Sequence, residues 1–186
     1  NRPEVASAEG QIASFVDKLH TRGTERDTYF LKKLFKKTHQ QFLRHYATHA
    51  DFGDLFTKGN YDCLTATALF ATLLERFGYQ YRIYETNYHI FLMVKTIDGE
   101  VLIESTDPIY GFESDKNEIQ KRIQSYLKSN AGDEESYNYK SETFRPIDNS
   151  ALAGLLLFNQ AVNSFNSREL KPTKFTELKE TWSWLP

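Results

Sequence analysis

Cys63 is the single cysteine among the 186 residues, and it stands where a nucleophile can be built. The residues before it, 59–62, read Gly-Asn-Tyr-Asp, which is typical of a turn and a helix cap, and a helical apolar run follows over 63–77. Backbone N–H groups at a helix N-terminus lack partners and form the positive end of the helix dipole. Both effects favour the thiolate, the form of cysteine that attacks carbonyl carbons.

Two further side chains that cysteine chemistry requires follow in order along the chain. His89 opens an apolar run typical of a strand, and Glu104 ends the next such run, after the hairpin turn Asp98-Gly99. Because a hairpin returns its second strand beside its first, Glu104 is expected beside His89, where a carboxylate can orient the imidazole. His89 then serves as general base and acid for Cys63. Asp107 is the alternative acid.

The elements that must position these residues are helices followed by an antiparallel sheet, which predicts an α+β fold. The Cys63 helix ends at Gly78, and its apolar residues lie on most of its sides, so we expect it to be central and buried against the sheet. The spacing of apolar residues predicts helices over 11–20, 27–49, 63–77, 115–128 and 150–165 and strands over 79–85, 89–97 and 100–104. Residues 1–10 are expected to be a loose lead-in, 129–146 a long loop, and 167–186 to hold a short helix.

Four segments, taken in order, resemble the transglutaminase-like branch of the papain-type cysteine enzymes. They are residues 59–66, 74–79, 89–94 and 101–106. In that family a cysteine begins a helix, a glycine ends it, a histidine opens a strand and an acid closes the next. The resemblance covers about residues 40–112 and implies a papain-like core with Cys63, His89 and Glu104 as its triad. The family usually has aspartate where this chain has Glu104.

The resemblance implies a hydrolase or acyl transferase that acts on an amide or peptide bond of a peptide or protein, through a thioester. It implies no cofactor. The oxyanion formed during such a reaction needs hydrogen-bond donors. The backbone N–H of Cys63 is one candidate, and the second donor remains open among Gln40, Gln41, Tyr46 and Asn60. We expect one domain over 1–186, with the 40–112 core and a C-terminal helical extension over 147–186.

Composition excludes several other classes of protein. The net charge is −2 without a basic stripe, which argues against nucleic-acid binding, and no run approaches the ~18 apolar residues of a membrane span. His45 and His49 have the i, i+4 spacing that can bind zinc, but no glutamate lies between them as in a metalloprotease, so no metal site is expected. The chain does not begin with Met, and a removed signal peptide, with an extracytoplasmic location, is a hypothesis.

Two rival interpretations stay open. The same fold can serve as a catalytically inactive binding or scaffold module, in which Cys63 is an ordinary small apolar core residue. Alternatively, the C-terminal helices are the functional surface of a helical interaction module.

Overall fold

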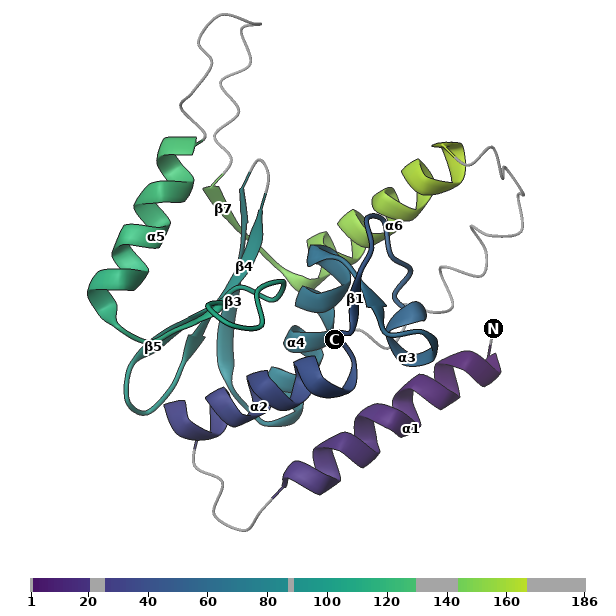
Figure 1. Ribbon diagram of the computed structural model, residues 1–186, viewed down its shortest axis with the longest axis horizontal. Coiled ribbons are helices and arrows are strands. Elements are labelled where there is room, and N and C mark those ends of the chain that lie inside the picture. Colours follow the sequence, from purple (N-terminus) through teal and green to yellow (C-terminus); the bar gives the residue numbers. More distant parts are fainter. Residues whose placement is uncertain (1, 21–25, 87–88, 130–143, 167–186) are drawn as a thin grey trace, which may run out of the picture.

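A five-stranded antiparallel sheet, a two-stranded parallel sheet (β1-β2) and six helices make up the part of the chain that the computed structural model describes, residues 2–20, 26–86, 89–129 and 144–166 (Figure 1). The predicted α+β class is confirmed. The helices are α1 (Arg2–Leu19), α2 (Thr28–Gln41), α3 (Asp54–Thr57), α4 (Cys63–Arg76), α5 (Lys116–Ser129) and α6 (Asn149–Asn166). The strands are β1 (His45–Tyr46), β2 (Asn60–Tyr61), β3 (Gln80–Thr86), β4 (Ile90–Lys95), β5 (Glu100–Ile103), β6 (Phe112–Glu113) and β7 (Phe144–Ile147).

The sheet has the strand order β6-β5-β4-β3-β7, and all its neighbours are antiparallel. The predicted hairpin joins β4 to β5, with Val94 opposite Val101 and Gly99 in the turn at φ 143°, a value that favours glycine. This pairing brings the start of β4 beside the end of β5. His89, which directly precedes β4, and Glu104, which directly follows β5, are thereby brought together.

Side chains alternate between two buried faces of the sheet. The inner face packs against α4 and carries Leu92, Val94 and Val101, all fully buried in the main core. The outer face carries Phe91 and Leu102, which form a second cluster with residues of α5. Both faces of the central strands are thus covered by helices, which explains why the sequence of β4 is nearly continuously apolar.

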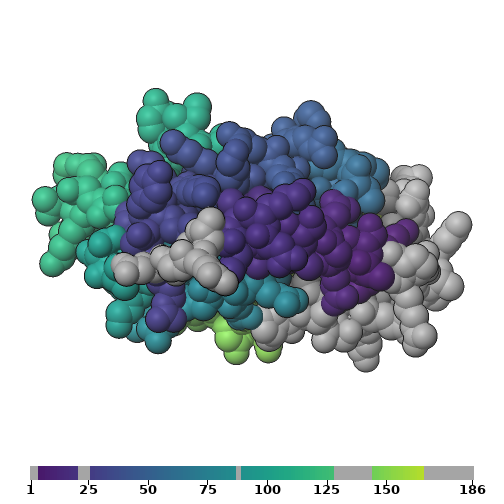
Figure 2. Space-filling model, turned by 90° about the horizontal axis from the view of Figure 1, so that it is seen from below, coloured from purple at the N-terminus to yellow at the C-terminus, as the bar shows by residue number. Residues whose placement is uncertain are grey.

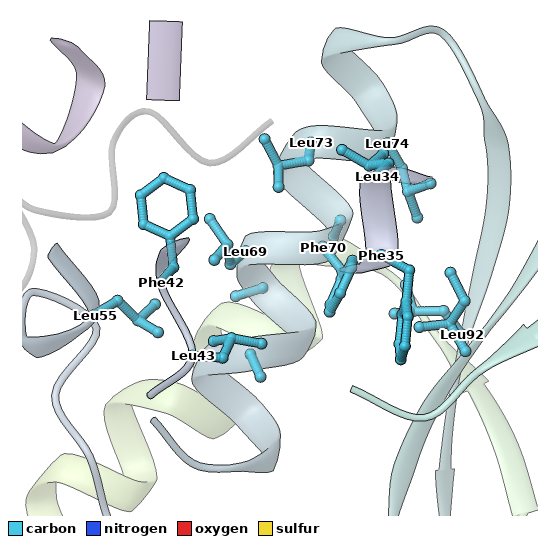
Figure 3. Packing of buried hydrophobic residues seen from close by; sticks show 14 of the residues in the cluster. Leu34, Phe35, Phe42, Leu43, Leu55, Leu69, Phe70, Leu73, Leu74 and Leu92 are labelled. Atoms are coloured by element: carbon cyan, nitrogen blue, oxygen red, sulfur yellow. The ribbon is translucent and has the colours of Figure 1, made fainter. Parts of the chain in front are cut away.

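Helix α4 lies at the centre of the molecule, as expected, and every residue from 65 to 74 is buried. Its start is fixed by a capping box in which Asp62 accepts from the Thr65 backbone N–H while the Thr65 hydroxyl accepts from the Asp62 N–H, both at 2.8 Å. It ends at Arg76, and Gly78, just beyond the C-cap residue Phe77, has a φ of 71° that suits a glycine after a helix. Figure 3 shows Phe70 of α4 beside Phe35 of α2, while Leu69 lies on the side of the helix toward Phe42.

The remaining helices surround α4. Helix α1 lies across one face of the molecule beside α2, as Figure 2 shows, and its Phe15 ring meets Phe42 edge-on with centroids 5.2 Å apart. Helix α6 runs antiparallel to α4, because Asn149 at its start bonds Glu75 near the end of α4, and Asn159 bonds Asp62 at the beginning. Among the helices that the structure describes, none is long and apolar enough to cross a membrane.

Three sequence-based expectations about element bounds are wrong. Residues 2–10 belong to α1 instead of forming a loose lead-in, since Ala8 and Ile12 anchor one apolar face of that helix. The helix predicted over 27–49 ends at Gln41, because the backbone at His45 pairs with β2 instead. Residues 144–147 form β7 on the edge of the sheet, whereas the sequence predicts a loop up to residue 146. The short helix expected within 167–186 lies outside the described residues.

Candidate active site

His89 and Glu104 form the tightest polar pair of the candidate site. His89 Nε2 lies 2.6 Å from Glu104 Oε1, and the carboxylate is buried with 7% of its surface exposed. The hydrogen bond from Glu104 raises the pKa of His89, against the opposing effect of burial. Because Nε2 is committed to Glu104, the neutral imidazole carries its proton there, and Nδ1 is the nitrogen left to act as base.

The alternative acid, Asp107, has a different role. Its Oδ1 accepts from the backbone N–H groups of Ile109 and Tyr110 at 2.9 and 2.8 Å, so it closes the turn that follows β5. Gly111 completes that turn by donating to the Asp107 carbonyl, and the Gly111 carbonyl accepts from the Glu104 N–H at 2.7 Å. The turn therefore holds the backbone of Glu104, while Glu104 itself contacts His89.

The orientation of Cys63 follows from its place one turn before Thr67. Residues i and i+4 share a helix face. The hydroxyl of Thr67 lies 3.0 Å from the Ser105 hydroxyl, and both side chains are buried. Cys63 therefore lies on the face of α4 that turns toward the end of β5, where Glu104 stands beside Ser105.

The thiol is nevertheless poorly ionised, contrary to the expectation from its place on the helix. Burial is the main cause, and it raises the pKa of Cys63 to about 11. The Asp62 carboxylate raises it further and Glu104 contributes in the same direction, whereas the N–H groups of Leu64 and Cys63 oppose them. The N-terminal N–H groups thus act as predicted, but desolvation and the neighbouring acids outweigh them.

Asp62, which is buried, begins a partly buried chain of hydrogen bonds. Its Oδ2 accepts from Asn159 Nδ2 at 2.7 Å, and Asn159 Oδ1 accepts from Nδ1 of His49. The carboxylate next to Cys63 is therefore held from α4 through Thr65 and from α6 through Asn159. Helix α6, which lies outside residues 40–112, thus contacts the residue that caps the Cys63 helix.

Replacing Asp62 by asparagine is expected to raise the reactivity of Cys63 at a modest cost in stability. Asparagine keeps the helix cap through its Oδ1, but its NH2 group replaces the oxygen that accepts from Asn159, so the free energy of unfolding should fall by about 1 kcal/mol. Removing the charge should lower the pKa of the thiol and speed iodoacetamide labelling at pH 8 several-fold. The comparison is made in a His89→Ala background, so that only the thiol's own ionisation is measured. Asp62→Ala, which loses the cap as well, is the control and should cost about 1–2 kcal/mol. If the double variant with Asp62→Asn and the single variant His89→Ala were labelled at equal rates, the Asp62 charge would not be a cause of the raised pKa of Cys63.

Within the described residues, no hydrogen bond joins Cys63 to His89. The Glu104 carboxylate contacts His89, and its charge adds to the raised pKa of Cys63. Burial is the main cause that raises the pKa of the phenol of Tyr46, one of the candidate oxyanion donors, and the Cys63 charge adds to it.

The structure describes no group of three or more histidine, cysteine or acidic side chains that could hold a metal ion. His45 and His49 do not share a helix face, because α2 ends before them. A cavity of about 740 Å³ lies at the other end of the hairpin from His89, between Asp98, Met93 and Ile119, and is separate from this site.

Two contributors to the site escaped the sequence patterns. His39 of α2 is buried, and its Nε2 lies 3.1 Å from the Ser105 carbonyl oxygen. Tyr126 of α5 donates its hydroxyl to Glu104 Oε2 at 2.6 Å. Neither residue has a spacing in the sequence that relates it to the triad candidates. Comparison of the chain with protein-family models, curated proteins and solved structures gave no significant match.

Proposed function

We propose that this chain is a cysteine-dependent enzyme that hydrolyses or transfers the acyl group of an amide or peptide bond, on a transglutaminase-like, papain-type core over residues 40–112. The single observation that carries the proposal is the buried His89–Glu104 pair, at 2.6 Å, whose carboxylate acts electrostatically on the thiol at the start of α4. Cys63 is the nucleophile, His89 the general base and acid, and Glu104 the group that orients the imidazole.

In this mechanism the thiol is activated at the moment of attack. Because the pKa of Cys63 is raised to about 11, the resting thiol is protonated near neutral pH. As Sγ bonds to the substrate carbonyl carbon, its proton passes to Nδ1 of His89, and the imidazolium formed is stabilised by Glu104. The developing oxyanion is near the N–H groups of Cys63 and Leu64, which helical geometry leaves without intrahelical partners.

The second half of the proposed reaction returns the site to its starting state. His89 Nδ1 gives its proton to the departing amine as the carbon–nitrogen bond breaks, which leaves a thioester on Cys63. Water or a second amine then attacks that carbon and loses a proton to Nδ1. The carbon–sulfur bond breaks, the proton returns to Sγ, and the product is an acid when water attacks or a new amide when an amine attacks.

The pH profile of iodoacetamide labelling tests this function, and the single cysteine makes the readout unambiguous. If His89 acts as base, the labelling rate should rise as His89 loses its proton. Because the pKa of His89 is raised, this rise should come above the ordinary histidine pKa of about 6.5 and level off well below pH 11. His89→Ala should remove that rise and leave only the increase toward the thiol's own pKa of about 11. A wild-type profile that already follows the thiol alone would refute the proposed enzyme.

The raised pKa of Cys63 also favours a second candidate function. A protein on this fold that has lost its chemistry would serve as a peptide-binding or scaffold module, with a thiol that is an ordinary buried side chain. In that case labelling should be slow near neutral pH and unaffected by His89→Ala, so the same measurement separates the two candidates.

A further inference from the structure

Both oxygens of the Glu104 carboxylate are held by short hydrogen bonds from different elements. Oε1 lies 2.6 Å from His89 Nε2, and Oε2 accepts at 2.6 Å from the hydroxyl of Tyr126 on α5. Short bonds of this kind to an ionised acceptor are among the stronger ones in proteins. A carboxylate held at both oxygens cannot rotate away from the imidazole without breaking one of them.

Tyr126 also contacts His89, the residue that is paired with Glu104. Its ring meets the His89 imidazole edge-on, with centroids 5.4 Å apart and an interplanar angle of 86°. The hydroxyl thus restrains the acid while the ring limits the space into which the base can turn. One side chain acts on both groups.

The position of Tyr126 is set by the docking of α5 on the outer face of the sheet. Its ring lies 5.3 Å from that of Phe91, and Ile119 and Ile123 of the same helix pack into the same cluster. Helix α5 comes after the 40–112 segment, so a part of the chain beyond the resemblance to the transglutaminase-like family reaches the candidate site.

We propose that Tyr126 is a positioning residue that holds Glu104 on Nε2 of His89 and thereby keeps Nδ1 turned to act as the base for Cys63. This inference rests on the proposed function. Burial, together with the Glu104 carboxylate, raises the pKa of Tyr126. The phenol therefore remains protonated, and remains a donor, across the pH range in which a histidine titrates.

The test is Tyr126→Phe, which removes the hydroxyl and retains the ring. The readout is the pKa of His89, followed by NMR of the imidazole resonances and assigned by the signal that disappears in His89→Ala. We expect the pKa of His89 to fall toward the ordinary value of about 6.5, because Glu104 is then free to leave the ring. Glu104→Gln gives the shift expected when the charge is lost completely.

Tyr84→Phe is the matched control, since Tyr84 stacks on Phe91 in the same outer-face cluster, with centroids 5.5 Å apart. It should leave the pKa of His89 unchanged. The unfolding midpoints of Tyr126→Phe and Tyr84→Phe should be close, which shows that both variants are folded. If the pKa of His89 in Tyr126→Phe is then unchanged or raised, the inference is overturned. The NMR titration needs no reaction at Cys63. It therefore decides the role of Tyr126 even if the labelling profile refutes the proposed enzyme.

Discussion

Gly111→Ala is expected to destabilise the fold and to separate Glu104 from His89. A Cβ at this position would lie 2.2 Å from the carbonyl oxygens of both Glu104 and Asp107. Both contacts are with backbone, so no side-chain rotation relieves them, and the turn after β5 must open. The cost should be about 3 kcal/mol or more, seen as a fall of roughly 6–12 °C in the midpoint of thermal unfolding.

The same substitution should alter the site. Opening the turn breaks the hydrogen bond from the Glu104 N–H to the Gly111 carbonyl and displaces the carboxylate that raises the pKa of His89. The NMR titration of His89 in Gly111→Ala should then give a pKa closer to 6.5. Gly154→Ala is the control: this glycine lies inside α6 with nothing within 4 Å of its added Cβ, so alanine should stabilise by about 0.5–1 kcal/mol. A stable Gly111→Ala variant with an unchanged His89 would show that the turn does not set the position of Glu104.

Glu104→Gln is expected to make the stability of the protein less dependent on pH between 5.5 and 9. The folded pKa of His89 is raised above its unfolded value of about 6.5 by Glu104. Stability from such a pair is fully present below the unfolded pKa and is lost as the pH rises through the folded one. The substitution should therefore cost more at pH 5.5, about 1–2 kcal/mol after allowance for the partial exposure of His89, than at pH 9.

Urea unfolding of the two proteins at both pH values measures this difference. Glu118→Gln, which removes an exposed pair with Lys121, is the control and should cost less than about 0.5 kcal/mol at either pH. A loss for Glu104→Gln that is equal at pH 5.5 and pH 9 would mean that the carboxylate does not stabilise a charged His89. It would then weaken the assignment of Glu104 as the orienting acid.

The sequence by itself determined the local elements around the candidate site. Asp62 and Thr65 have the spacing of a capping box, so the start of the Cys63 helix follows from a few neighbouring residues. The Asp98-Gly99 turn fixes the register of β4 against β5, and that register brings His89 to Glu104. These features depend on interactions between residues close in the chain, which spacing reveals. Longer apolar patterns were less reliable, as the overextended helix over 27–49 shows.

Only the tertiary structure decided the chemical state of the site. A helix N-terminus alone favours a thiolate at Cys63, but the pKa depends on how completely water is excluded and on which charges lie near. Asp62 adjoins Cys63 in the sequence, whereas the burial of the thiol and the approach of Glu104 are set by segments distant in sequence. Tyr126 reaches Glu104 because α5 docks on the outer face of the sheet, and Asn159 reaches Asp62 because α6 runs antiparallel to α4. No periodicity records such contacts, since they arise from the packing of whole elements whose positions are fixed only when the core forms.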